Sequence, residues 1–102
     1  MTRKKITKIL LIGGRNKAYS MAMSLIDQGY KVTVINNDYN ECVKLADING
    51  LTVIYGDATK PFILDEAGAS DCDIAIALTS KDADNLVACQ LCKKKFSVTK
   101  TV

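Results

Sequence analysis

The 102-residue sequence predicts a single α/β domain built on a parallel sheet. Short apolar stretches rich in β-branched residues alternate along the chain with longer segments whose apolar residues recur at helical spacing. Glycine, asparagine and proline mark most of the boundaries between them. Parallel strands need crossover connections of about a dozen residues, and the helical segments supply them.

Five segments are expected to form strands. The first, Ile6–Ile12, is a nearly continuous apolar run that ends in Gly13-Gly14, which is typical of a strand buried on both faces. The remaining strands are expected at Lys31–Ile35, Leu51–Tyr55, Asp73–Leu78 and Val98–Val102, the last being only the start of a fifth strand.

Helices are expected between the strands. The first covers Ala18–Gln28 and stops at Gly29. The second is capped by Asp38 or Asn40 and ends at Asn49-Gly50. Its apolar side is expected to hold Cys42, Val43, Leu45, Ala46 and Ile48.

Two further helices complete the pattern. Lys60-Pro61 opens a short helix through Ala67, because proline suits the first helical turn. Thr79 or Ser80 is expected to cap a long helix that runs to about Lys95. The lysines of its last turn suit the negative end of the helix dipole.

Crossovers of this kind are right-handed, so the elements predict a Rossmann-type, doubly wound parallel sheet. The expected strand order is 3-2-1-4-5, with helices on both faces. Because the sequence stops in a fifth strand with no helix after it, we expect residues 1–102 to be one domain cut from a longer protein.

Charge and composition exclude several classes of protein. The formal net charge is +3, with basic residues grouped at Arg3–Lys8 and Lys93–Lys100, and the aromatic residues are scattered. A nucleic-acid partner is therefore not expected. The sequence shows neither a signal peptide nor an apolar run of the ~20 residues that span a bilayer. We expect a cytosolic chain with reduced thiols.

The pair Cys89-x-x-Cys92 has the spacing of a metal or redox motif. The sequence has no histidine, so a four-ligand zinc site would need Cys42 and Cys72 from distant elements. Two small residues one helical turn apart usually pack inward. We therefore expect this pair to belong to the core, and no metal is expected.

A ligand site is expected where the strand order reverses, between strands one and four. In such sheets ligands bind beyond the carboxyl ends of the strands. The loops at that edge are Gly13–Lys17, Asn36–Asp38, Gly56–Thr59 and Thr79–Asn85.

The first of these loops departs from the G-x-G-x-x-G pattern of a phosphate-binding turn. Gly13 is the first glycine, Arg15 stands at the second place and Ala18 at the third. Alanine at the third place still permits close helix–strand packing, whereas a side chain at the second place tends to occupy the pyrophosphate space. A tight turn without a ligand remains an alternative.

The second loop departs as well. A dinucleotide site places an acidic residue at the end of strand two to hold the ribose hydroxyls, and here that place is Asn36. Asp38 follows two residues later, where a helix cap is the expected role. The carboxylates Asp57, Asp82 and Asp84 have neither a histidine base nor a placed nucleophile beside them, so no catalytic residue is expected.

The sequence resembles the N-terminal half of RCK domains, also called TrkA-N or KTN domains, over nearly its whole length. The matching stretches include Leu10-Leu11-Ile12-Gly13, Gly56-Asp57-Ala58-Thr59, Ile76-Ala77-Leu78-Thr79 and Asp84-Asn85-Leu86, and the last three are more specific than the glycine loop. The resemblance implies a chain that lacks the last strand and the C-terminal lobe of an RCK domain.

The resemblance also implies a function. Such domains are cytoplasmic gating proteins rather than enzymes, and they bind NAD(H), ATP, ADP or AMP. They form homodimers and larger rings at the inner face of the membrane, where their partner is a potassium transporter or channel subunit.

Carried onto this sequence, the resemblance implies a set of ligand contacts. The expected phosphate contacts are Gly13, Gly14, Arg15, Asn16 and Lys17, and the expected ribose contact is Asn36. The expected adenine-side contacts are Asp57 and Ala58, with further loop contacts at Leu78, Thr79 and Asn85.

Arg15 and Lys17 add positive charge at the phosphate end, and Asn36 removes the acidic ribose anchor. We therefore expect an adenine mononucleotide in preference to NAD. Two alternatives stay open: a scaffold domain of the same family that has lost its ligand, and the cofactor domain of a dehydrogenase, which would need a substrate domain.

Overall fold

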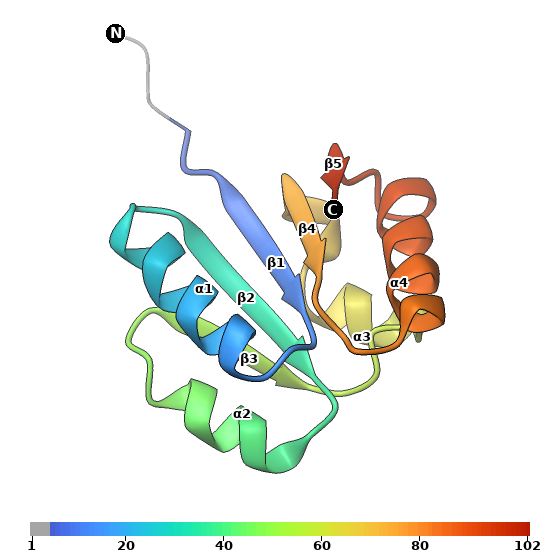
Figure 1. Cartoon of the computed structure of the whole chain (residues 1–102). Coiled ribbons are helices and arrows are strands. Elements are labelled where there is room, and N and C mark those ends of the chain that lie inside the picture. The colour runs from blue at the N-terminus through green and yellow to red at the C-terminus, as the bar shows by residue number, and fades with distance from the viewer. Residues whose placement is uncertain (1–4) are drawn as a thin grey trace, which may run out of the picture.

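A computed structural model describes residues 5–102 and confirms the predicted α/β class. Its five strands form one parallel sheet in the order β3-β2-β1-β4-β5, as predicted (Figure 1). The strands are β1 (Lys8–Ile12), β2 (Lys31–Asn36), β3 (Leu51–Tyr55), β4 (Ile74–Ala77) and β5 (Lys100–Thr101).

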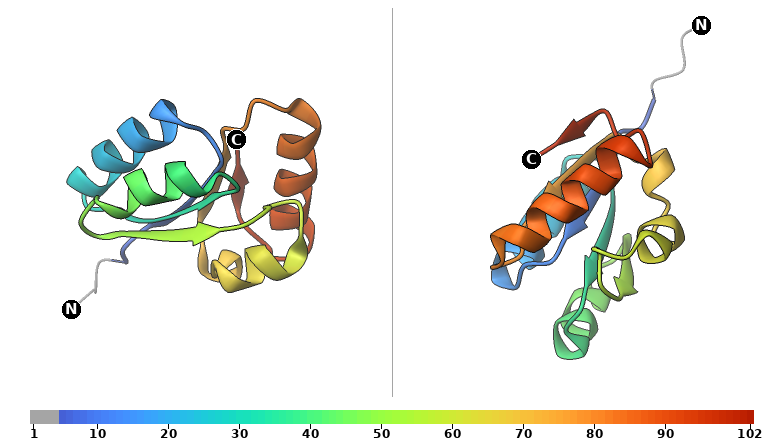
Figure 2. Two further views of the ribbon diagram at one scale, coloured as in Figure 1. Left: turned by 90° about the horizontal axis from the view of Figure 1, so that it is seen from below. Right: turned by 90° about the vertical axis from the view of Figure 1, so that its right-hand side faces the viewer.

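Helices cover both faces of this sheet. Viewed along the strands, α1 and α2 lie on one face, while α3 and α4 lie on the other (Figures 1 and 2). The helices are α1 (Asn16–Asp27), α2 (Tyr39–Ala46), α3 (Pro61–Glu66) and α4 (Asp82–Lys94), and a 3₁₀ turn that the sequence did not predict spans Ala69–Asp71.

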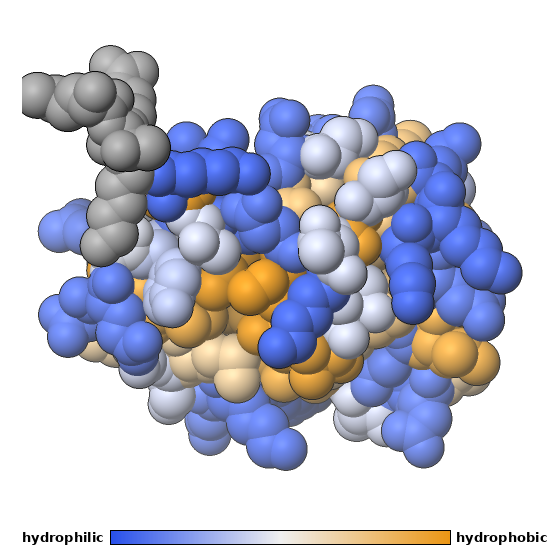
Figure 3. All heavy atoms as spheres, turned by 90° about the horizontal axis from the view of Figure 1, so that it is seen from above, coloured by the Kyte–Doolittle hydropathy of each residue, from blue (hydrophilic) through white to orange (hydrophobic). Residues whose placement is uncertain are grey.

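The central strand β1 divides the core into two layers. Leu10 and Ile12 pack toward α3 and α4, whereas Ile9 and Leu11 pack toward α1 and α2. All four side chains are buried, which confirms the prediction of a strand covered on both faces. Seen from above, apolar side chains gather in the middle of the molecule and hydrophilic ones surround them (Figure 3).

Several boundaries differ from those predicted. The first strand begins at Lys8 rather than at Ile6. Ile6 lies outside the sheet, and its side chain is exposed. Helix α2 is only eight residues long and buries Cys42 and Leu45 alone, so the placement of Val43 and Ala46 on its apolar side was wrong.

The predicted caps had opposite outcomes. Asp38 caps α2, as predicted, by accepting hydrogen bonds from two backbone N–H groups of its first turn. The cap predicted for α4 was wrong: Lys81 is the N-cap residue, and it makes no side-chain capping bond. The Thr79 hydroxyl oxygen accepts a hydrogen bond from the Lys81 N–H at 3.2 Å, one residue before the helix begins, and the hydroxyl donates to Asn85 Oδ1 at 2.6 Å.

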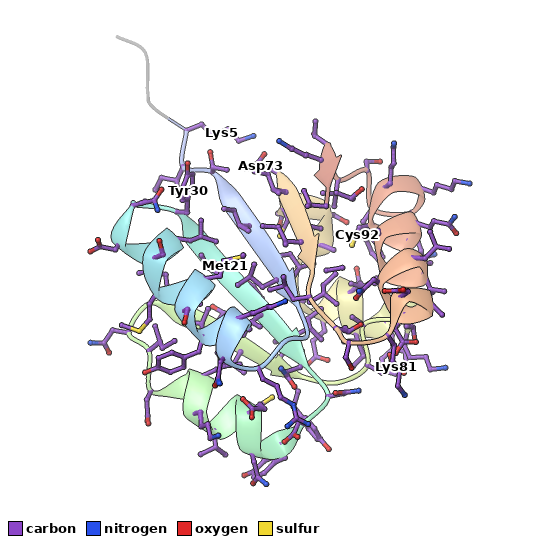
Figure 4. The ribbon with its side chains drawn as sticks, viewed as in Figure 1. Lys5, Met21, Tyr30, Asp73, Lys81 and Cys92 are labelled. Atoms are coloured by element: carbon purple, nitrogen blue, oxygen red, sulfur yellow. The ribbon has the colours of Figure 1, made fainter. Side chains whose placement is uncertain are left out.

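Lys5 and Lys8 are bonded to Asp73, the residue that precedes β4. The Asp73 carboxylate accepts a hydrogen bond from the Lys8 backbone N–H at 2.9 Å and pairs with Lys5 Nζ at 3.2 Å (Figure 4). Both hydrogen bonds lower the pKa of Asp73, and the bond from the Lys8 backbone has the larger effect. Arg3 and Lys4, the first members of the N-terminal basic group, lie outside the described residues.

The cysteines do not form a metal site in the part of the chain that the structure describes. Cys92 points from α4 into the core and is fully buried, whereas Cys89, one turn earlier, is half-buried (Figure 4). The core assignment is thus confirmed for Cys92. Across residues 5–102, no helix has the length and apolar character needed to cross a membrane.

Burial of Cys92 predicts a difference in thiol reactivity along α4. Desolvation raises the pKa of its thiol to about 11, so at pH 8 almost none of it is thiolate. We expect iodoacetamide at pH 8 to label Cys92 at least ~10-fold more slowly than Cys89, as measured by peptide mass spectrometry. Equal labelling in urea is the control, and equal labelling of the folded chain would contradict the assignment.

Candidate ligand site

The candidate site lies at the carboxyl ends of the central strands, as the topology predicted. The Gly13 N–H donates to the Ile35 carbonyl at 2.7 Å, and the Leu78 N–H donates to the Ile12 carbonyl at 2.7 Å. These two bonds continue the sheet ladder for one step beyond the strands. The loops that follow β1, β2 and β4 therefore leave the sheet at the same level.

Between these loops lies an open pocket of about 500 Å³. It is lined by the whole predicted phosphate loop, Gly13–Lys17, together with Asn36 from the second loop and Leu78 and Thr79 from the fourth. Eight of the predicted contact residues thus surround one space.

The other predicted contacts lie elsewhere. Asp57 and Ala58 line a smaller adjoining space of about 30 Å³, which is roughly the volume of one water molecule. The Asp57 carboxylate accepts hydrogen bonds from the hydroxyl and the backbone N–H of Thr59, at 2.7 and 2.9 Å. These bonds lower the pKa of Asp57, so the group is firmly ionised and turned toward its own loop.

Asn85 lines neither space. Its Oδ1 accepts hydrogen bonds from the hydroxyl and backbone N–H of Thr79, at 2.6 and 3.1 Å, and its Nδ2 donates to the Thr79 carbonyl at 3.0 Å. The side chain therefore fixes the loop between β4 and α4, and it contributes to the pocket through Thr79.

The first loop is shaped by two consecutive glycines rather than by a G-x-G spacing. Gly13 and Gly14 have φ values of 73° and 90°, in the left-handed region that favours glycine, whereas Arg15 has φ −124°. The left-handed backbone thus falls at Gly14, one residue before the second glycine place of the usual motif. Arg15, at that place, has a negative φ with ψ −106°, outside the helical and extended regions.

These glycines also permit close packing. A Cβ atom on Gly13 would lie 2.4 Å from the Thr79 methyl carbon. A Cβ atom on Gly14 would lie 3.1 Å from the Cβ atoms of Ala18 and Leu78. Ala18 itself is fully buried, which confirms that the third place of the motif serves helix–strand packing.

Three helices, α1, α2 and α4, begin at the pocket. Of these, α1 has the N-terminus that suits an anion. It has no side-chain cap and no acidic residue in its first turn, and Arg15 and Lys17 stand beside it. The first turn of α2 is closed by the Asp38 cap, and that of α4 carries Asp82 and Asp84. A phosphate group is therefore favoured at α1, where free N–H groups and the helix dipole act together.

Asn36 is held by the protein itself. Its Nδ2 donates to the Gly14 carbonyl at 2.8 Å, and its Oδ1 accepts from the Asp38 N–H at 2.9 Å. Only 3% of the residue is exposed, and within residues 5–102 it is the one buried residue with a polar side chain.

Sequence reasoning missed part of the pocket lining. Glu41 reaches the pocket from the first turn of α2, and Lys81 and Asp84 reach it from the start of α4 (Figure 4 labels Lys81). Acidic residues in a first helical turn are common for electrostatic reasons alone, so their type gave no sign of a pocket. Lys81 belonged to the fourth loop, but no spacing rule singled it out.

Comparisons with known proteins place the chain in a family. The sequence pattern of the TrkA-N domain matches residues 9–102. The chain is 32% identical over 95 residues to the Trk system potassium uptake protein TrkA of Vibrio alginolyticus, covering 93% of this chain and 21% of that protein. It is 32% identical over 94 residues to a TrkA homolog of Methanothermobacter thermautotrophicus, covering 92% of this chain and 43% of that protein.

Solved structures agree on the fold. The chain superimposes on the GsuK channel bound to NAD with a TM-score of 0.78 at 19% identity, covering 98% of this chain and 18% of that one. The GsuK RCK domain gives a TM-score of 0.76 at 19% identity, covering 98% of this chain and 22% of that one. The chain thus spans under half the length of each protein compared.

The packing of Gly13 against Thr79 predicts a large cost for G13A. Backbone strain and overpacking should together lower the free energy of unfolding by about 2–4 kcal/mol. G29A is the matched control, because Gly29 has φ 94° but an added Cβ would meet nothing within 4 Å. It should cost about 1–2 kcal/mol through strain alone. Urea denaturation measures both, and equal costs would show that the contact with Thr79 is unimportant.

Proposed function

Because the chain belongs to the TrkA-N domain family, also called the RCK N-terminal domain, we propose that it is a regulatory domain of a potassium transport system and senses a nucleotide. The observation that carries this proposal is the pocket at the switch point of the sheet, with the uncapped, basic N-terminus of α1 at its edge. Phosphate groups are the ligands such an edge favours.

The relatives support a proposal for the physiological partner. TrkA proteins are named as Trk system potassium uptake proteins, and GsuK is a channel. We propose that this chain acts on a membrane potassium transporter or channel subunit from the cytoplasmic side, as a homodimer or larger ring. In this role the ligand changes the shape of the domain and the domain changes potassium flux, with no covalent chemistry at the site.

Two classes of ligand are compatible with the family. One solved relative is described as bound to NAD. In this chain Arg15 occupies the second glycine place, where a dinucleotide pyrophosphate would approach the backbone. Arg15 and Lys17 instead offer two cations to a chain of phosphates. We therefore propose ATP, ADP or AMP as the preferred ligand, ahead of NAD(H).

A degenerate scaffold domain is the second candidate, and the internal bonding of Asn36 is the observation that favours it. The two candidates differ in whether the pocket is ever occupied. A dehydrogenase domain has less support, because Asn36 rather than an acidic residue ends β2 and Arg15 rather than glycine stands at the second place of the turn motif.

Thermal denaturation with ATP, ADP, AMP, NAD or NADH tests the proposal. A ligand at roughly 100 times its dissociation constant should stabilise the fold by about 2.7 kcal/mol, a rise in Tm of roughly 10 °C or more. We expect ATP or ADP to stabilise the chain more than NADH does. Greater stabilisation by NADH would reverse the ligand preference, and no stabilisation by any at millimolar concentration would favour the scaffold.

Removal of the positive charges of the first loop tests whether ATP binds there. The double variant R15A/K17A should weaken ATP binding by roughly tenfold or more, because two charge-assisted contacts are lost. The matched control is K93A/K94A, which removes the same charge from the last turn of α4, away from the pocket. Isothermal titration calorimetry gives both affinities, and equal weakening would mean that general charge rather than this loop attracts the ligand.

A further inference from the structure

We propose that Asn36 is a specificity-determining residue that closes the ribose-anchoring position of the pocket, so that ligand recognition does not depend on the ribose hydroxyls. This inference rests on the proposed function, since it concerns which features of a nucleotide the site reads. It is carried by the two hydrogen bonds and the burial of one side chain.

Asn36 ends β2, at the position where dinucleotide-binding folds of this kind place a carboxylate. In those folds the carboxylate is free on the ligand side and accepts the hydrogen bonds of the ribose hydroxyls. Here the side chain joins two loops instead. Its Nδ2 bonds to Gly14 in the first loop at 2.8 Å, and its Oδ1 bonds to Asp38 in the second at 2.9 Å. We call this pair of bonds the Asn36 bridge.

The chemistry of the bridge requires an amide. Gly14 presents a carbonyl oxygen, which needs a donor, and Asp38 presents a backbone N–H, which needs an acceptor. Asparagine supplies one of each, whereas an ionised aspartate supplies only acceptors. A carboxylate at this position would set one oxygen against the Gly14 oxygen in a site that is 3% exposed. Asparagine is therefore required by the bridge and excludes the usual ribose anchor.

The acidic neighbours are also engaged. The Asp38 Oδ1 accepts the N–H groups of Asn40 and Glu41 at 2.9 and 3.2 Å, which fixes the start of α2. The Glu41 carboxylate pairs with Lys44 Nζ at 3.6 Å. Asp38 is thus bonded to the first turn of α2 and Glu41 is paired with Lys44, while Arg15 and Lys17 remain exposed at the phosphate end of the same pocket.

The bridge also shapes the phosphate loop. It holds the Gly14 carbonyl oxygen on the Asn36 amide at the end of β2. A carbonyl oxygen turned toward a phosphate would repel it, so this orientation favours an anion at α1. The Asn36 side chain thus supports the phosphate-binding loop and does not bind the sugar.

Comparison of ATP with 2′-deoxy-ATP tests the specificity claim on the unmodified chain. We expect the two dissociation constants, measured by isothermal titration calorimetry, to agree within about twofold. A 2′-deoxy-ATP affinity at least ~10-fold lower would overturn the inference while leaving the proposed function intact. If neither compound binds, the preference for ATP fails and this inference falls with it, whereas the proposed function fails only if ADP, AMP, NAD and NADH do not bind either.

The bridge itself is tested by N36D against the matched control N37D. Asn37 is the exposed neighbour that lines the same pocket, so both variants add one carboxylate at this edge. We expect N36D to lower the Tm at pH 7 by at least ~5 °C and N37D to change it by under about 2 °C. Equal Tm values for N36D and N37D would show that the Asn36 bridge does not stabilise the fold.

The pH dependence separates loss of the bridge from a general charge effect. A protonated carboxyl group can donate to the Gly14 oxygen, so the folded state should raise the pKa of the carboxyl introduced by N36D. Stability then falls as pH rises through that pKa. The difference in Tm between N36D and N37D should therefore shrink from pH 7 to pH 4.5. A difference that is constant with pH would contradict the proposed hydrogen bond.

Discussion

The Gly13–Gly14 turn is the constraint on which the site depends. It leaves the central strand where the strand order reverses, and it is held on both sides. On one side Asn36 bonds to the Gly14 carbonyl at 2.8 Å, and on the other Thr79 leaves no room for a Cβ atom on Gly13. Asn85 in turn fixes Thr79. Three loops from distant parts of the sequence are thus joined at one turn, and the pocket exists because they are joined.

The charge arrangement follows from the same geometry. Three helices begin at the pocket, but α2 and α4 place acidic residues in their first turns. Of the three, only α1 combines an uncapped start with a first turn free of acidic residues, and Arg15 and Lys17 stand beside it. An anionic ligand is therefore directed to one side of the pocket. In the regulatory role proposed, a ligand there would contact loops from β1, β2 and β4 at once, which is how a small molecule can shift a whole domain.

The fold was predictable and the fine structure of the site was not. Strand identity and order followed from the apolar run of β1 and the alternation of elements, which depend on local periodicity and on the handedness of crossovers. The role of Asn85 and the two bonds of Asn36 depend on which side chains meet after folding, and spacing along the chain does not encode this. The cap expected at Thr79 was wrong because α4 begins only at Asp82, and the Thr79 hydroxyl bonds instead to Lys81 and Asn85. Arg15 was predicted to occupy the pyrophosphate space at the second glycine place of the usual spacing, and that spacing did not reveal that Gly14 adopts the left-handed backbone.

The central claim is that the pocket beside the Gly13–Gly14 turn receives a nucleotide phosphate. Titration of ¹⁵N-labelled chain with ATP, followed through backbone amide chemical shifts, tests it most directly. The account predicts the largest changes at the amides of Gly14–Ala18, with smaller ones at Asp38 and Thr79. No change is expected at Lys31 or Gly68. These two residues line a separate pocket beside the starts of β1 and β2. Unchanged amides in the first loop at saturating ATP, or changes confined to that other pocket, would contradict it.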